Sequence, residues 1–475
     1  PQLTRGREVA DPSIFKHKNK YYALSTQMYS FDGPGMLVWE SEDMVNWSQP
    51  KNIVINGKLD PMMAPELIYS EGSYYLYWSV PGTTVPESHY LAKYTPDKES
   101  GDFDPFGANA EYNLLTNDFL NIGEVNIDGE IFFDKNDIYM FFCGFGGIQY
   151  KKLLSLENSG SDPKIQLSDC VIKITDTEVG DPGAPGWTEA PGLFYEDGYY
   201  YMTYSGNHFQ SPTYQIHSAR GSSIENIKPY KQNPLIEKRD GLYNGLGNNN
   251  FITGPDLKTK YTSYHVKIGT GIHTSESGPI NRQMMLDKYT VSPESGIETE
   301  APVFTDQEVP SAVEWENKMA DLGDNMETSA TVQSTNGITT LTSGELLSVV
   351  NSKVDFVVEG NIRPVTAESD ISRYGLTSID GKLKFAIELG DSATGSGAKL
   401  VYYIDGEGWT DLGITGVVFN VWHKLNIDKK ENKIKFYYDD RYVGEAVISI
   451  NEEGKFGYFS EGGAAELSWI GQANY

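Results

Sequence analysis

A hairpin pattern that occurs five times between residues 11 and 266 is the feature that most constrains the fold. Each copy has a short apolar strand, a polar turn containing Gly, Asp, Lys or Asn, and a second strand rich in Tyr or Phe, which is typical of a β-hairpin. The second strands begin near Tyr21, Tyr74, Tyr139, Tyr199 and Tyr261, at intervals of 53, 65, 60 and 62 residues. Hairpins repeated at this period predict radial β repetition.

Further strands between the hairpins fit four strands per repeat, for example MLVWESEDMVNW at 36–47, SHYLAKYTP at 88–96 and TYQIHSARGSS at 213–223. The chain is therefore predicted to be all-β, with a five-bladed β-propeller over residues 1–305. Residues 306–324 read as a linker. Residues 325–475 alternate apolar and polar residues in short strands without the blade repeat, which predicts a β-sandwich domain.

Charge and composition narrow the range of possible binding partners and substrates. The chain has 38 basic and 66 acidic residues and a net charge of −28, which argues against nucleic acid and anionic membrane surfaces because phosphates need Lys and Arg. Aromatic residues make up 12% of the chain, a rich supply of flat surface for packing or for sugar stacking. These properties suit a neutral oligo- or polysaccharide.

The first strand of each blade lines the axis of a propeller, so residues where these strands begin converge at one mouth. Here those positions carry Asp11, Glu66, Asp128, Glu189 and Asn248. Two charges about 4 Å apart repel by several kcal/mol at intermediate dielectric, so one acid is expected to stay protonated while another stays ionised. Glycoside hydrolysis needs such a pair. A turn or cap role explains a lone acid but not four, although Glu66 could also bind the backbone of a blade or a substrate hydroxyl.

Five motifs, in order, resemble those of glycoside hydrolase family 43: ADPSIF at 10–15, SEDMVNW at 41–47, APELIYSEGSYYLYWS at 64–79, NIDGEIFFDKND at 126–137 and TEAPGLF at 188–194. The resemblance covers roughly the first 300 residues and implies an inverting mechanism. It implies that Asp11 is the base that deprotonates a water, that Glu189 is the general acid, and that Asp128 tunes and orients Glu189. An inverting pair stands about 6.5 to 9.5 Å apart.

Other residues are predicted to contact substrate. Arg282 resembles the family's arginine that reaches into the site, with a surface ion pair as the alternative. His208 could bind a sugar hydroxyl or cap a turn. Phe31, Trp78 and Trp187 are placed near the rim, where they could stack on sugars, although blade packing is the more common role.

The mechanism requires no cofactor, but the resemblance raises the question of a metal. Many family members carry a histidine on the fifth inner strand, at or near an axial calcium ion. Asn248 occupies that position here, and an amide oxygen can ligate calcium. An axial calcium ion bound by Asn248 is therefore an open expectation.

The leading functional hypothesis is an exo-acting α-L-arabinofuranosidase or β-xylosidase of plant polysaccharides. An endo-arabinanase, an exo-galactanase and a non-catalytic carbohydrate-binding propeller are the alternatives. The C-terminal domain slightly favours exo action, because such domains often close one side of the pocket. It either binds carbohydrate through Trp409 or Tyr402 or buttresses the propeller. The expected location is extracellular or periplasmic after removal of a signal peptide, with the cytoplasm as the alternative.

Overall fold

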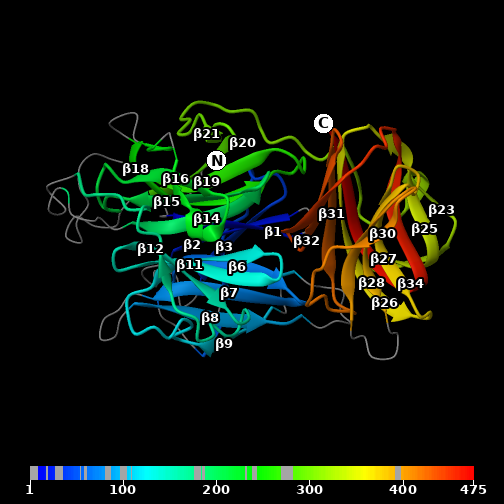
Figure 1. Cartoon of the computed structure of the whole chain (residues 1–475), viewed down its shortest axis with the longest axis horizontal. Coiled ribbons are helices and arrows are strands. Elements are labelled where there is room, and N and C mark those ends of the chain that lie inside the picture. The colour runs from blue at the N-terminus through cyan, green and yellow to red at the C-terminus, as the bar shows by residue number, and fades with distance from the viewer. Residues whose placement is uncertain are drawn as a thin grey trace.

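The computed structural model describes residues 9–17, 20–26, 36–53, 55–57, 61–80, 87–96, 104–107, 110–175, 183, 188–230, 233–237, 243–268, 282–390 and 397–475. Within these ranges the regular structure is β, apart from two short 3-10 turns, η1 (Ile224–Asn226) and η2 (Gly323–Asn325). No helix among these residues is long and apolar enough to cross a membrane. Two β bodies lie side by side (Figure 1), which confirms the predicted propeller and sandwich.

Each blade is a sheet built from strands that follow one another along the chain. Blades 1 and 2 comprise β1 (Ala10–His17), β2 (Lys20–Thr26), β3 (Met36–Ser41) and β4 (Lys51–Ile53), and β6 (Met63–Ser70), β7 (Ser73–Val80), β8 (Ser88–Tyr94) and β9 (Tyr112–Thr116), with β5 (Ile55–Asn56) at the edge of blade 2. Blades 3 and 4 comprise β10 (Ile127–Asp134), β11 (Asp137–Gly144), β12 (Gly147–Leu153) and β13 (Ile165–Gln166), and β14 (Glu189–Glu196), β15 (Tyr199–Gly206), β16 (Gln215–Gly221) and β17 (Lys228–Pro229). Blade 5 comprises β18 (Tyr243–Thr253), β19 (Lys260–Ile268), β20 (Arg282–Ser292) and β21 (Gly296–Thr299).

The cores of the propeller lie between the blades. Tyr22 of blade 1 packs with Trp78 of blade 2, and similar clusters join blades 2 and 3, blades 3 and 4, and blades 4 and 5. The ring closes where Trp39 of blade 1 packs with Tyr261 of blade 5. A backbone hydrogen bond of 2.8 Å from the N–H of Val9 to the carbonyl of Arg282 lies at the same junction. The tyrosine-rich second strands of the repeat therefore supply packing surface between neighbouring sheets.

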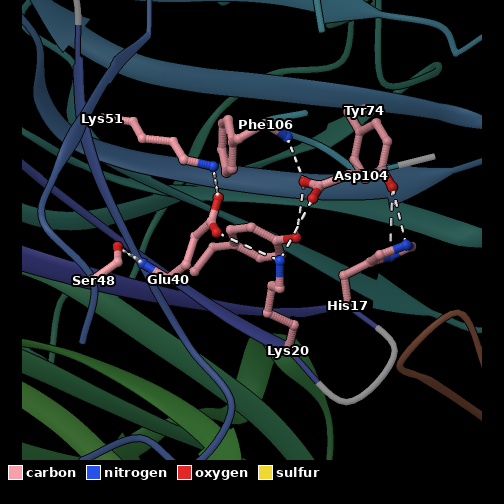
Figure 2. Close-up of polar contacts among 9 residues, drawn as sticks. His17, Lys20, Glu40, Ser48, Lys51, Tyr74, Asp104 and Phe106 are labelled. Atoms are coloured by element: carbon pink, nitrogen blue, oxygen red, sulfur yellow. Dashed lines mark hydrogen bonds and ion pairs between the residues drawn. The ribbon is translucent and has the colours of Figure 1, made fainter. Parts of the chain in front are cut away.

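Polar contacts tie the outer parts of blades 1 and 2 together (Figure 2). The hydroxyl of Tyr22 donates to Asp104 over 2.8 Å, and Asp104 also accepts the backbone N–H of Phe106 over 2.9 Å. Lys20 lies 3.4 Å from Glu40 and 3.8 Å from Asp104. Asp104 belongs to the segment between β8 and β9, so this cluster joins blade 1 to blade 2 at a distance from the axis.

The first strand of every blade is irregular near its start. Five residues there adopt positive φ angles between 44° and 54°: Asp11, Ala64, Asp128, Ala190 and Asn248. The hairpin register shifts at the same five places, as expected for a β-bulge. A bulge redirects side chains, and left-handed backbone is costly for residues other than Gly, Asn and Asp. Ala64 and Ala190 are therefore strained, and the five bulges around one axis mark this end of the propeller as the candidate functional end.

The C-terminal domain is a two-layered sandwich. Its strands are β22 (Trp315–Asn317), β23 (Met326–Thr328), β24 (Thr331–Thr335), β25 (Ile338–Ser352), β26 (Phe356–Ala367), β27 (Ser372–Ser378), β28 (Leu383–Leu389), β29 (Lys399–Ile404), β30 (Gly408–Asp411), β31 (His423–Lys430), β32 (Lys433–Tyr438), β33 (Arg441–Val447) and β34 (Gly454–Asn474). One layer runs through β30, β29, β28 and β27, and the other through β26, β31, β32 and β33, with the long strand β34 between them in the pairing order. Phe436 on β32 packs 5.0 Å from the rings of Phe385 and Tyr402 in the opposite layer. Strand β22 lies inside the predicted linker and pairs with β34.

The sandwich docks against the end of the propeller where the hairpin turns lie. It contacts the first hairpin of every blade: Lys16 meets Glu359, Tyr69 donates to the carbonyl of Trp422, Asn136 donates to the carbonyl of Gly413, Glu196 meets Lys435, and Lys258 donates to the carbonyl of Asn474. The bulges lie at the other ends of the same first strands, about 20 Å away at roughly 3.3 Å per residue. These described contacts therefore lie far from the mouth that the bulges surround.

Candidate active site

Asp11 occupies the bulge of β1 and is held by three side chains. Thr26 Oγ1 donates to Asp11 Oδ2 over 2.5 Å, and Arg282 Nη1 lies 3.5 Å from Oδ1. His265 Nδ1 lies 3.2 Å from both the backbone nitrogen and Oδ1 of Asp11, two contacts that belong to different imidazole tautomers. Burial opposes the charge, but Arg282, His265 and Thr26 outweigh it and hold the pKa of Asp11 below its usual value. Asp11 is thus an ionised carboxylate at neutral pH.

Asp128 and Glu189 have the opposite electrostatic character. Burial and the nearby charges of Glu189 and Asp11 raise the pKa of Asp128 well above its usual value. Burial also raises the pKa of Glu189 to about 7, although a hydrogen bond from Tyr214 acts to lower it. Both of these carboxyls therefore favour their protonated forms more than free carboxylic acids do. The site therefore combines an ionised acid with a protonated one.

Tyr214 and His265 connect the two kinds of acid. The hydroxyl of Tyr214 donates to Glu189 Oε1 over 2.7 Å, and its ring stacks on the ring of His265 with centroids 5.8 Å apart and planes inclined by 9°. His265 in turn contacts Asp11. A tyrosine ring and an imidazole ring therefore lie in the contact path from Glu189 to Asp11.

Second-strand side chains hold the bulged backbone of the next blade. Thr26 Oγ1 accepts the N–H of Ala64 over 2.8 Å, Ser79 Oγ accepts the N–H of Asp128 over 2.9 Å, and Ser205 Oγ accepts the N–H of Asn248 over 2.8 Å. His265 Nδ1 is placed in the same way toward the N–H of Asp11. Each acceptor faces the residue just before the bulge of its own hairpin. These links fix the bulges of blades 1, 2, 3 and 5 from the neighbouring blade.

The acids do not share one register, contrary to the expectation from sequence. Asp11, Asp128 and Asn248 occupy equivalent bulge positions, whereas Glu189 comes one residue before its bulge and Glu66 two residues after. Both carboxylate oxygens of Glu66 accept the backbone N–H of Ile131, over 3.1 and 2.8 Å. Glu66 lies deeper in the channel, where burial and Glu130 raise its pKa. This placement matches the alternative role of Glu66, which is to bind the backbone of a neighbouring blade.

The predicted aromatic contacts fall in different places. Trp78 is 2% exposed and packs against Tyr90, with ring centroids 5.6 Å apart, so the predicted rim position for Trp78 is wrong: its ring belongs to the core between blades 1 and 2. Phe31 and Trp187 lie outside the described residues. In the sandwich, Tyr402 stacks on Phe436 in the core, and the Trp409 ring lies 4.4 Å from the Arg373 guanidinium.

Arg282 and His208 lie beside the acids. Arg282 is 6% exposed, contacts Asp11, and its guanidinium lies 5.9 Å from the ring centroid of Phe209. His208 is half-buried, accepts the N–H of Gln210 over 3.2 Å, and stacks on Phe209 with centroids 4.9 Å apart. The loop after β15 therefore brings His208 and Phe209 close to the Arg282–Asp11 pair. Their roles toward a substrate stay predictions.

The axial calcium ion also stays a prediction. The backbone N–H of Asn248 donates to Ser205, and the described residues contain no cluster of three or more His, Cys, Asp or Glu side chains that could hold a metal ion. Both carboxylate oxygens of Glu66 accept the same backbone N–H, that of Ile131. This donor set does not fit a protein-coordinated calcium site, which uses six to eight oxygen ligands, and no step below is routed through a metal.

Sequence analysis missed Thr26, Tyr214 and Glu87. Thr26 could have been found, because it faces the residue before Asp11 in the hairpin register. Tyr214 stands at the start of a third strand in a chain with 31 tyrosines, and nothing in its spacing separates it from the others. Glu87 precedes β8, is half-buried, and its charge acts to raise the pKa values of both Asp128 and Glu189.

Comparison with known proteins identifies relatives. Over 229 residues the chain is 28% identical to extracellular endo-alpha-(1->5)-L-arabinanase 1 of Bacillus subtilis (strain 168), a match that covers 45% of this chain and 65% of the relative, less than two thirds of its length. A crystal structure of a thermostable family-43 glycoside hydrolase superposes with a TM-score of 0.51 at 22% identity, covering 64% of this chain and 96% of the other. The GH43 protein BlXynB from Bacillus licheniformis aligns over 98% of both chains, with a TM-score of 0.49 and 16% identity.

A family match agrees with the propeller and with the motifs around its mouth. It covers residues 6–295, which is more than half of the chain and includes the five blades up to the residue before β21. The protein belongs to glycosyl hydrolases family 43.

Proposed function

We propose that this protein is an inverting hydrolase of α-L-arabinofuranosyl linkages in plant polysaccharides such as arabinan and arabinoxylan. The observation that carries the proposal is the pairing of opposite protonation states at one mouth. Asp11 is held ionised by Arg282, His265 and Thr26, while burial raises the pKa of Glu189 to about 7. An inverting glycosidase needs a carboxylate base and a carboxylic acid at the same time.

In the proposed reaction, Asp11 removes a proton from a water as the water attacks the anomeric carbon. Glu189 gives its proton to the glycosidic oxygen, so the leaving sugar departs as an alcohol. Arg282 stays beside Asp11 and keeps its charge, which limits how strongly Asp11 binds a proton before the attack. Asp128 is the proposed orienting residue for Glu189, and burial favours the neutral form of Glu189, which helps return it to its protonated state after turnover.

Arabinose is the proposed sugar because the Bacillus subtilis relative is named an arabinanase. A β-xylosidase is the second candidate, since the family's three acids suit both sugars. The argument for exo action from the C-terminal domain loses its support, because the described contacts place that domain at the hairpin-turn end and not at the mouth. Cleavage at chain ends and cleavage within chains are therefore separate arms of the test. An extracellular or periplasmic location is part of the proposal, following the name of that relative.

Activity on 4-nitrophenyl α-L-arabinofuranoside, 4-nitrophenyl β-D-xyloside, debranched arabinan and xylan tests the proposal. We expect arabinose-containing substrates to be cleaved. Because the mechanism is inverting, the first sugar released from the α-linkage should be the β-anomer, as seen by ¹H NMR. Release of arabinose alone from arabinan indicates exo action, and a ladder of oligosaccharides indicates endo action. Cleavage of xyloside only supports the second candidate. Binding of these polysaccharides without cleavage, with Glu189→Gln indistinguishable from the wild type, contradicts an enzymatic role and supports a non-catalytic propeller.

A further inference from the structure

Tyr214 makes a contact that the three-acid mechanism does not use. It lies just before β16, is 1% exposed, and donates its hydroxyl to Glu189 Oε1 over 2.7 Å. A phenol with a raised pKa stays protonated in the working pH range, and burial and the nearby Glu189 raise the pKa of Tyr214 well above its usual value. Tyr214 is therefore a fixed donor toward one oxygen of Glu189.

The surroundings hold the Tyr214 ring in this position. Its face stacks on His265, and its backbone carbonyl accepts the N–H of Leu246 over 2.9 Å. Gly247 lies against the ring edge so closely that a Cβ there would stand 1.7 Å from Tyr214 Cε1. Position 247 has no room for a side chain because the ring of Tyr214 occupies that space. The ring therefore has little room to swing away from Glu189.

We infer that Tyr214 is a positioning residue for the general acid: by donating to Oε1 of Glu189, it leaves the transferable proton on Oε2. A carboxylic acid has one proton and two oxygens, and an oxygen that accepts a strong hydrogen bond is the one that carries no proton. The proton on Oε2 is then free to pass to the glycosidic oxygen. This inference rests on the proposed function, because only an enzyme that protonates a leaving group benefits from the placement.

Leaving-group dependence separates this role from a purely structural one. General acid catalysis accelerates reactions by about 10² to 10⁴ when the leaving group is a sugar alcohol, and it matters little for an acidic phenol that departs unprotonated. Tyr214→Phe should lower kcat on arabino-oligosaccharides roughly 10- to 100-fold, while kcat on 2,4-dinitrophenyl α-L-arabinofuranoside changes less than about threefold. The alkaline limb of kcat/KM should also move to higher pH, because the Tyr214 hydrogen bond acts to lower the pKa of Glu189.

Two further variants complete the experiment. Gly247→Ala keeps the hydroxyl but displaces the ring, and it should reproduce the selective loss on oligosaccharides. Tyr204→Phe is the matched control, because Tyr204 is a tyrosine of the same blade that is also 1% exposed and lies beside Cys170 instead of the acids. It should leave both rates unchanged.

The possible failures are distinguishable. An equal loss of kcat on both classes of substrate, with no movement of the alkaline limb, overturns the inference and leaves a structural role for Tyr214. Unchanged kinetics of Tyr214→Phe and Gly247→Ala overturn it as well. A wild-type protein that cleaves neither substrate contradicts the proposed function itself. If Tyr214→Phe does not fold, Gly247→Ala supplies the same comparison of leaving groups.

Discussion

The two ends of the propeller bury charge in opposite ways. At the hairpin-turn end every buried acid named above meets a lysine: Glu359 meets Lys16, and Glu196 meets Lys260 and Lys435. Burial opposes the charge on Glu359 and Glu196, but these lysines outweigh it and lower both pKa values. These acids are ionised and paired.

At the mouth, Arg282 is the one close cation that the described residues provide for Asp11, Asp128 and Glu189, and it lies next to Asp11. Burial therefore decides for the other two, and the pKa values of Asp128 and Glu189 rise. At the hairpin-turn end of the blades, the acids are therefore paired with lysines and contact the sandwich. At the mouth, Asp128 and Glu189 lack such a lysine partner among the described residues and can hold a proton. The contrast indicates that nearby cations, more than burial, distinguish the structural acids from the proposed catalytic ones.

The largest effect should come from the one acid at the mouth that has its own cation. Asp11→Asn keeps the shape and tolerates the positive φ angle, but it removes the base, so kcat should fall by about 10³-fold or more. Release of reducing sugar from arabinan is the measurement, with thermal unfolding to show an intact fold. Glu157→Gln, at an exposed ion pair with Lys93, is the control with normal turnover. An Asp11→Asn variant with near-normal kcat would remove the distinction between the two ends.

Breaking a pair at the other end should change stability and not turnover. Lys16 and Glu359 lie 2.9 Å apart with side chains 4% and 6% exposed, so Lys16→Met leaves a buried carboxylate without its closest partner. We expect a loss on the order of 3 kcal/mol in the free energy of unfolding, measured with urea, at unchanged kcat. Lys93→Met, which breaks an exposed pair, should cost about 1 kcal/mol or less. Equal losses in the two variants would mean that the buried Lys16–Glu359 pair stabilises the protein no more than the exposed Lys93–Glu157 pair does.

The pH dependence of the wild type should show the mouth directly. Glu189 must be protonated to act as the acid, so kcat/KM should fall as the pH rises above about 7, where burial sets the pKa of Glu189. The acidic limb should appear only in strongly acidic buffer, because Arg282 and His265 hold the pKa of Asp11 below its usual value. An alkaline limb that is the same in Glu189→Asp and wild type would assign that limb to another group.

Stability should follow the same proton. Because burial raises the pKa of Glu189 from 4.5 to about 7, the folded protein holds a proton that the unfolded chain releases between these pH values. Its contribution to stability is present below pH 4.5 and is lost as the pH rises through 7. Glu189→Gln should therefore be more stable than the wild type at pH 8, by on the order of 2 kcal/mol, and not at pH 4. Urea unfolding at the two pH values measures the difference, and a gap independent of pH would speak against a buried, proton-holding Glu189.

The smallest effect should come from the aromatic surface of the sandwich. The guanidinium of Arg373 lies 4.4 Å from the ring centroid of Trp409, and Tyr403 packs 5.4 Å from it, so the ring is engaged within the domain. Trp409→Ala should change the fraction of protein bound to insoluble arabinan by less than about twofold, because sugars stack on free ring faces. A larger loss of binding would assign carbohydrate binding to the sandwich.

The fold followed from sequence because the repeat is long and regular. Five hairpins with tyrosine-rich second strands require five similar sheets, and those tyrosines pack between blades as expected of them. The placement of Asp11, Asp128 and Glu189 around one mouth follows from the same repeat. The motif residues were predictable because each stands at the start of a first strand.

Details that depend on side-chain direction were not predictable. A bulge shifts register by one residue, so counting along the strand cannot tell that Glu66 binds the backbone N–H of Ile131 while Asp128 lies near the charges of Glu189 and Asp11. Trp78 reads as a rim residue from its place near a strand end, but packing between two blades buries it. The docking of the sandwich on the hairpin turns depends on pairs such as Lys16 and Glu359, which are 343 residues apart and carry no local signal.

The junction between blades 5 and 1 has a consequence for the thermal inactivation of the protein. Among the described residues, each of these two sheets is built from its own stretch of chain, so no shared strand bridges the junction. The contacts across it include the backbone hydrogen bond from Val9 to Arg282 and the contacts of His265 and Arg282 with Asp11. Loosening at this junction would move Asp11, the proposed base, away from the residues that hold it. If this junction opens first on heating, turnover should be lost at a lower temperature than the one at which the whole protein unfolds.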